Sequence, residues 1–410
     1  MKRLFAVALG ILTAIGGFVD IGDLVTNAAV GARFGLSLVW VVVVGVVGIC
    51  VFAEMSGRVA AVSGRGTFDL VRERLGPRTG LANLVASVAV TFLTLTAEIG
   101  GVALALELAS SIHSLLWIPV VGFLVWLVLW RVRFGTLENV FGTAGLALIV
   151  FAVAVWKLGP DWGELAGAAL HPAVPGGETA TAYWFYAVAL FGAAMTPYEV
   201  FFFSSGGVEE KWGPKDLATM RSNVFIGFPL GGLLSVAIAT SAALVLLPAK
   251  IDVQTLGQVG LPVVAALGKV GLVLVLIGFF AATFGAACET GLSVGYAVAQ
   301  YSGFQWGKFV EPRHASRFHA VVLLSCVLAV GLLLTTVDPI LVTEYSVVFS
   351  AVALPLTYMP ILVVANDRSY MGEHVNGRLA NALGSVYLVV VVVASIAAIP
   401  LLVFSGGGQS

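Results

Sequence analysis

Apolar runs of about 20 residues recur along this chain and leave it very few possible folds. A helix of about 20 residues crosses the roughly 30 Å hydrocarbon core of a membrane. A chain inside lipid must satisfy its backbone polar groups internally, which helices and closed barrels do. Hydrophobic residues make up 59% of the 410 residues and charged residues 10%, against about 25% charged in soluble proteins. The sequence therefore predicts an all-α membrane protein in a lipid bilayer, and its net charge of −1 gives no indication of nucleic-acid binding.

The apolar runs predict about eleven transmembrane helices when each is required to be long enough to span the bilayer. Short polar loops separate them, and no segment has the composition of a soluble domain. The predicted spans are 4–31, 36–61, 80–110, 113–130, 137–157, 183–208, 221–248, 262–300, 318–336, 340–365 and 380–405.

The basic residues lie mostly on one side of this arrangement. All Lys and Arg residues except Arg33, Lys157, Lys250 and Lys269 fall at the N-terminus or in the even-numbered loops. Cytoplasmic loops carry an excess of Lys and Arg. We therefore expect a multi-pass protein of the plasma (inner) membrane, with its N-terminus in the cytoplasm and its C-terminus outside.

Polar residues interrupt two of the predicted spans. Asp20-Ile21-Gly22-Asp23 breaks span 1, and Thr196-Pro197-Tyr198-Glu199 breaks span 6. A carboxylate at the bilayer centre costs about 2.5–3.5 kcal/mol and usually marks a path for an ion or substrate. Interrupted helices at corresponding positions of two halves indicate a transporter's binding site near the midplane.

The two interrupted spans begin five spans apart, so they cross the membrane in opposite directions. This spacing predicts a 5+5 inverted repeat with broken helices 1 and 6. We expect the first repeat at 1–160, the second at 161–366, and an extra helix with a short tail at 367–410.

The residues at the two breaks offer oxygen ligands, which suit Mg²⁺, Ca²⁺ or Mn²⁺ better than later transition metals. The ion would be the transported substrate, and no resident cofactor is expected. The sequence carries neither a His-Glu-x-x-His nor a Gly-x-Ser-x-Gly motif, so we predict no enzyme activity, and it does not indicate an oligomeric state. The predicted metal ligands are Asp20, Asp23, Thr196 and Glu199, with the carbonyls near Gly17 and Ala193. The candidates for a vestibule or gate are Glu98, Tyr198, Glu289 and Met195, the last of which is also the one soft donor beside the second break.

The two breaks resemble the signatures of the NRAMP family of divalent-metal transporters. Residues 20–27 are similar to that family's Asp-Pro-Gly-Asn motif, and residues 196–199 stand where the family has Met-Pro-His-Asn. Segments 159–163 and 366–373 are also similar, so the resemblance covers nearly the whole chain. It implies divalent-cation transport and the fold of the sodium-coupled leucine transporter.

The departures from the family pattern resemble its magnesium-transporter branch. Thr196 stands in place of the family's metal-binding Met, Glu199 and Asp23 in place of Asn, and Tyr198 in place of His, while its span 3 acids are reduced to Glu98. A hydroxyl in place of a thioether removes discrimination against hard ions.

This pattern favours a Mg²⁺ transporter that also passes Mn²⁺, works by alternating access and is not coupled to protons. The alternative is a proton-coupled Mn²⁺ or Fe²⁺ symporter of the ordinary family type, with Met195 as a soft ligand. An amino-acid symporter on the same fold is disfavoured, because two aspartates at the first break would repel a substrate carboxylate.

Overall fold

The structure is a computed structural model that describes residues 18–132, 134–308 and 310–408. The described residues form helices and connecting loops, with no strand among them. The helices of the first half are α2 (Ile21–Phe34), α3 (Val39–Ser63), α4 (Thr67–Leu75), α5 (Pro77–Ser110), α6 (Ser114–Arg131), α7 (Phe134–Gly145), α8 (Ile149–Leu158) and α9 (Trp162–Ala168). Those of the second half are α10 (Ala180–Ala194), α11 (Pro197–Glu209), α12 (Leu217–Ser222), α13 (Phe228–Ala249), α14 (Leu256–Ser302), α15 (Ser316–Leu333), α16 (Pro339–Ala365), α17 (Arg368–Met371) and α18 (Arg378–Phe404).

Each of the eleven predicted spans has a helical counterpart. In the described part of the chain, ten helical stretches are long and apolar enough to cross a membrane. Helix α2 supplies the second half of span 1, and the first half of that span, 4–17, lies outside the described residues.

The eighth predicted span, 262–300, differs from the structure at its beginning. Helix α14 starts at Leu256 and is divided at Gly268, whose φ of 63° and ψ of −143° are not helical. The arm before Gly268 folds back on the rest, since a Cβ added to Gly260 would lie 2.8 Å from Val275. Hydropathy merges the two because both arms are apolar, and only a backbone conformation available to glycine separates them.

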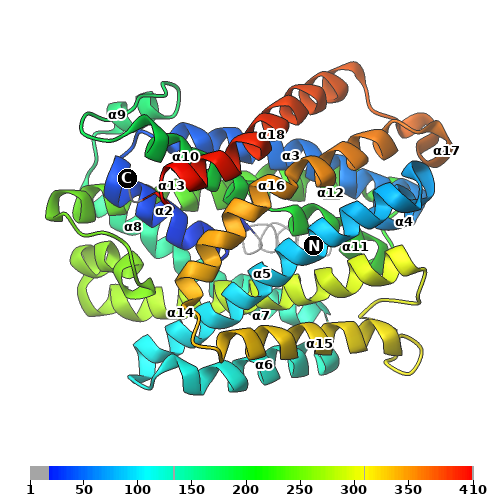
Figure 1. Ribbon diagram of the computed structural model, residues 1–410, viewed down its shortest axis with the longest axis horizontal. Coiled ribbons are helices and arrows are strands. Elements are labelled where there is room, and N and C mark those ends of the chain that lie inside the picture. Colours follow the sequence, from blue (N-terminus) through cyan, green and yellow to red (C-terminus); the bar gives the residue numbers. More distant parts are fainter. Residues whose placement is uncertain (1–17, 133, 309, 409–410) are drawn as a thin grey trace.

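The long helices lie side by side, with α6 and α15 along one edge of the bundle and α18 along the opposite edge (Figure 1). Helix α5 crosses the middle and packs against α14 and α16, while α2 packs against α13. Helices α4 and α17 lie at one end of the bundle, and α9 and the C-terminus lie at the other.

Ion pairs connect the loops at each end. At the end with α4 and α17, Glu54 binds both Arg58 and Arg221, and Arg74 pairs with Asp367. At the opposite end, Arg33 pairs with Glu178 at 2.9 Å and also donates to the carbonyl of Gly408. The loops predicted to share the cytoplasmic face thus contact one another at one end, which we call the basic end. The membrane face that this end meets stays a prediction.

Helix α16 contains a proline that leaves one backbone carbonyl without its helical donor, and α5 supplies another donor. Pro360 cannot donate to the carbonyl of Leu356, four residues earlier. The Asn83 side chain of α5 donates to that carbonyl at 2.7 Å. This bond fixes α16 against α5, and these two helices form a wall of the candidate site described below.

Close packing of α2 on α13 predicts that Gly31 tolerates no side chain. A Cβ at Gly31 would lie 2.0 Å from the backbone oxygen of Ala239. Overpacking costs about 1–3 kcal/mol, so Gly31→Ala should lower the thermal midpoint of the protein in detergent, measured by fluorescence-detected size-exclusion chromatography. Gly331→Ala on α15 is the matched control, because a Cβ there meets nothing within 4 Å. Equal midpoints for the two variants would contradict the contact between α2 and α13.

Candidate cation site at two interrupted helices

The first break is organised by Asp20, which caps the N-terminus of α2. Its backbone is extended, with φ −94° and ψ −177°, and its Oδ1 accepts a hydrogen bond from the Asp23 amide at 2.8 Å. Asp is among the preferred residues at this capping position. Gly22 lets the helix start close to α16, because a Cβ there would lie 2.9 Å from Val347.

The second break follows from the Thr196-Pro197 sequence. The residue before a proline is driven out of the helical region, and Thr196 has φ −60° and ψ 128°. Pro197 then starts α11, where a missing N–H has no consequence. Helix α10 ends before it, at Ala194, and Met195 follows as its C-cap with φ −118° and ψ 52°. The predicted interruption of span 6 is therefore present and has a local cause.

The two breaks meet inside the bundle. The Tyr198 hydroxyl of α11 donates to Oδ2 of Asp20 at 3.3 Å. Asp20 and Glu199 are 3% and 4% exposed and lie within electrostatic range of each other. Oε2 of Glu199 is buried and has no hydrogen-bond partner among the described residues. Within the part of the chain that the structure describes, no ion pair reaches either carboxylate.

A small cavity lies between the breaks and the wall formed by α5 and α16. Its volume, measured as the space open to the centre of a water-sized sphere, is about 10 Å³, which is room for about one water molecule. Asp20 and Thr196 line it from the two breaks, and hydroxyl-bearing side chains line it from the facing helices. Those side chains are Thr94 on α5 and Thr343, Ser346 and Ser350 on α16.

Asp23 does not join Asp20 and Glu199 in this conformation. One of its oxygens accepts from the Asn27 amide at 2.8 Å, and the other accepts from the Ser235 hydroxyl of α13 at 2.5 Å. Within the described residues, no three His, Cys, Asp or Glu side chains are placed to hold one ion together. The three-carboxylate set expected from the sequence is thus not assembled here, because α13 holds Asp23.

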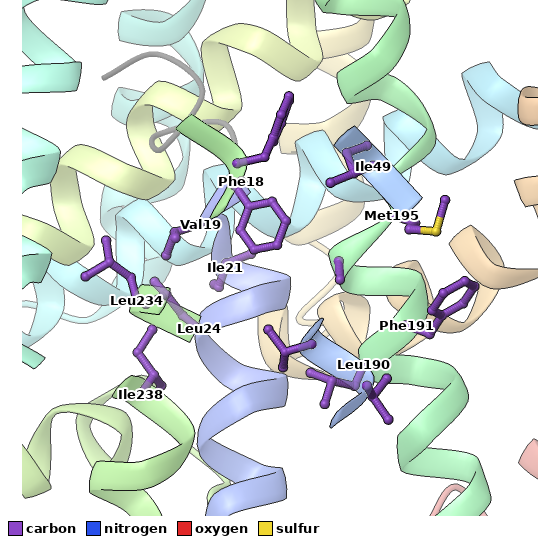
Figure 2. Close-up of a cluster of buried hydrophobic side chains, with 14 of the residues drawn as sticks. Phe18, Val19, Ile21, Leu24, Ile49, Leu190, Phe191, Met195, Leu234 and Ile238 are labelled. Carbon is purple, nitrogen blue, oxygen red and sulfur yellow. The ribbon is translucent and has the colours of Figure 1, made fainter. Parts of the chain in front are cut away.

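The Met195 side chain points away from the break. It is fully buried, and a Cβ on Gly48 of α3 would lie 2.6 Å from its sulfur. Figure 2 shows the sulfur on the side of α10 opposite to Ile21 and the start of α2. The polar group that Met195 presents at the break is its carbonyl, which accepts from the Tyr358 hydroxyl at 3.1 Å. Its thioether packs in the hydrophobic core.

The remaining predicted backbone ligands are less informative. Ala193 is buried in a small apolar cluster with Val347 and Ala351 of α16, so its neighbourhood is a packed helix interface. Gly17 lies outside the described residues.

Glu98 of α5 has a structural role at the first break. It is fully buried, and its Oε1 accepts from the Ile21 amide at 2.9 Å. The first amides of a helix have no partner within the helix, so this bond satisfies one that water cannot reach. Glu289 of α14 is 8% exposed and lies within electrostatic range of Glu98. Both predicted vestibule residues therefore lie near the breaks.

Sequence reasoning missed the hydroxyl-bearing wall on α16. Thr343, Ser346, Ser350 and Thr357 are spaced by three, four and seven residues, which places them along one helix face. That spacing could have identified the wall, but each residue alone is a common occupant of a membrane helix.

Two interrupted helices that meet at buried carboxylates within such a bundle define a secondary transporter. Residues 10–400 match the family described as Nramp, natural resistance-associated macrophage protein-like. The chain belongs to the Nramp family.

Proteins named as transporters are similar to this chain over most of their length. The divalent metal cation transporter MntH of Aeromonas hydrophila is 26% identical over 388 residues, which are 92% of this chain and 91% of that protein. The MntH of Acidiphilium cryptum is 25% identical over 365 residues, 87% of this chain and 81% of that protein. This chain is a transporter and not an enzyme.

Solved structures share the fold. A manganese transporter of Eremococcus coleocola is 18% identical with a TM-score of 0.72, covering 98% of this chain and 87% of that one. Mhp1, a nucleobase-cation-symport-1 family transporter, is 15% identical with a TM-score of 0.61, covering 97% and 92%. The predicted leucine-transporter-type fold is thereby confirmed. The repeat boundaries at 1–160, 161–366 and 367–410 stay a prediction.

The cap formed by Glu98 predicts different outcomes for two substitutions. Glu98→Ala leaves the Ile21 amide unsatisfied at a cost of about 1–3 kcal/mol, so hydrogen–deuterium exchange at the start of α2 should accelerate. Glu98→Gln keeps an acceptor oxygen and should exchange like wild type. Thr96→Ala is the control, because that buried hydroxyl bonds to Phe92 of its own helix. Unchanged exchange in Glu98→Ala would show that Glu98 does not hold the break.

Proposed function

We propose that this protein moves divalent cations into the cell by alternating access, with Mg²⁺ as the principal substrate and Mn²⁺ as a second one, without coupling to protons. The observation that carries the proposal is a buried set of oxygen ligands at the two breaks, with the neighbouring thioether turned away. The relatives named divalent metal cation transporters support the substrate class.

Asp20, Thr196 and Glu199 are the proposed ligands. Carboxylate, hydroxyl and carbonyl oxygens suit hard ions such as Mg²⁺ and Mn²⁺. A cation between Asp20 and Glu199 would supply the positive charge that two buried carboxylates require. Asp23 would contribute only after its hydrogen bond with Ser235 breaks, so we propose it as a ligand of another step in the cycle.

The surroundings of the proposed ligands favour an ion that keeps part of its water. Mg²⁺ loses water reluctantly and is usually bound through one or two carboxylates together with several waters. Small hydroxyl-bearing residues, which can hydrogen-bond such water, line the cavity beside Asp20 together with Ala97 and Val347. A thioether would instead favour softer ions.

Transport without protons is supported by what surrounds the breaks. All five histidines lie in loops or in the first turns and caps of helices. Glu98, the carboxyl group that α5 brings to the first break, accepts from the Ile21 amide through Oε1. The membrane potential alone supplies about 2.3 kcal/mol per charge per 100 mV, and twice that for a divalent ion. We propose that the basic end of the bundle faces the cytoplasm of the plasma membrane.

Reconstitution in liposomes distinguishes this proposal from proton-coupled symport. With a Mg²⁺ dye and a pH dye inside the vesicles and an inside-negative potential, we expect Mg²⁺ entry without acidification. Mn²⁺ entry with acidification and no Mg²⁺ signal would instead establish the ordinary symporter, in which Met195 leaves its packing against Gly48 to bind the metal.

Substitutions at the breaks test the ligand assignment. Asp20→Asn and Glu199→Gln each remove a charge at the site and should abolish uptake, while Asp23→Asn should retain a measurable fraction of it. Met195→Ala should not reduce Mg²⁺ uptake selectively, because the thioether lies in the core. Glu311→Gln is the control, since that carboxylate is exposed in the loop before α15. Wild-type uptake in Asp20→Asn or Glu199→Gln would refute the assignment.

A further inference from the structure

Helix α16 carries a row of buried hydroxyl groups that do not belong to either break. Thr343, Ser346, Ser350 and Thr357 are 1%, 4%, 1% and 0% exposed. Hydroxyls buried in helices usually bond to the backbone one turn earlier. Thr343 does so, donating to the carbonyl of Pro339 at 2.8 Å. Ser346 is paired with Thr94 of α5 at 2.8 Å.

Ser350 is different in two respects. Its Oγ is buried and has no hydrogen-bond partner among the described residues, and its side chain lines the cavity shared with Asp20 and Thr196. An unmade hydrogen bond at a buried hydroxyl is unfavourable, so such groups usually have a partner that is a water or a ligand. The cavity is the space from which that partner can come.

Thr357 provides an internal comparison. It lies two turns beyond Ser350 on the same face of α16, is equally buried, and its Oγ1 also lacks a partner among the described residues. It is not among the residues that line the cavity. The two hydroxyls therefore differ in whether they adjoin the proposed site.

We infer that Ser350 hydrogen-bonds a water molecule that the transported cation keeps, and so makes α16 the wall that recognises a hydrated ion. This inference rests on the proposed function. Ser346 and Thr94 are bonded to each other and connect α16 to α5, beside the cavity that Ser350 and Asp20 both line. Water retained by Mg²⁺ is strongly polarised, which makes a hydroxyl acceptor more effective than an apolar wall.

The role of Ser350 is one of selectivity among divalent ions. Mg²⁺ gives up water reluctantly, so the acceptor contributes to each Mg²⁺ ion bound. An ion that exchanges water for protein oxygens more readily depends on it less. Loss of the hydroxyl should therefore weaken Mg²⁺ more than Mn²⁺.

The experiment compares Ser350→Ala with Thr357→Val in liposomes at a fixed inside-negative potential. In Ser350→Ala, we expect the KM for Mg²⁺ to rise about tenfold, as for one lost hydrogen bond to a charged centre. The KM for Mn²⁺ should rise less than about threefold, a loss smaller than one such bond. Thr357→Val should leave both values unchanged. Ser350→Thr, which keeps the hydroxyl, should restore the preference for Mg²⁺.

Several outcomes overturn the inference. Equal rises for both ions in Ser350→Ala, no rise at all, or the same rise in Thr357→Val would each show that the hydroxyl does not select a hydrated ion. If the wild-type protein moves Mg²⁺ but Ser350→Ala leaves the ratio of the two KM values unchanged, the inference fails and the proposed function stands. If wild-type protein moves no Mg²⁺, both fail. Thermal midpoints of the variants in detergent identify any loss caused by unfolding.

Discussion

Unpaired backbone groups at the two interruptions are the constraint on which the rest of the structure depends. Buried backbone groups need a hydrogen-bond partner, so each broken helix end must find one within the bundle. Glu98 accepts from the Ile21 amide, Asp20 accepts from the Asp23 amide, and Tyr358 donates to the carbonyl of Met195. The hydrogen bonds that satisfy these backbone groups therefore also hold α5 and α16 against the breaks.

The same arrangement leaves negative charge in the middle of the protein. The ion pairs of the described residues lie at the two ends of the bundle, and none of them reaches Asp20, Glu98 or Glu199. A buried carboxylate without a cation is strongly unfavourable. Such a carboxyl group is neutralised by a bound cation or by a proton, and a bound cation is what the proposed function supplies.

The sequence predicted what local chemistry determines. Thr196-Pro197 cannot continue a helix, and Asp20 is a strong capping residue, so both breaks could be located without a structure. The spacing of apolar runs likewise placed a predicted span at each of the ten membrane-length helical stretches in the described residues. The division of α14 was missed because Gly268 lies inside a continuous apolar run.

Contacts between distant helices were not predictable in the same way. The position of Asp23 depends on Ser235 of α13, more than 200 residues away in the sequence. The direction of the Met195 side chain depends on the space that Gly48 of α3 leaves for it. The sequence did not predict a role for Ser350, because that role depends on the cavity that Ser350 lines and not on its neighbours in sequence. Ligand sets inferred from sequence alone therefore include residues that tertiary packing turns away.

Where helix α11 reaches the basic end, hydrogen bonds connect it to α14 and to the loop after α14, beside an aromatic contact of Phe202 with Tyr296. Gln300 donates to Ser205 at 2.8 Å, and Glu209 accepts from the Tyr296 hydroxyl at 2.5 Å and from the Lys308 amide at 2.7 Å. Water can replace such bonds with a small net change in free energy. The packing of α2 on α13 differs, because apolar side chains that include Leu24 and Ile238 pack there beside the hydrogen bond between Asp23 and Ser235. Water gains nothing by entering that apolar contact. Under the proposed alternating access one end must open while the other stays closed, and the hydrogen bonds between α11 and α14 are contacts that water can replace at the basic end.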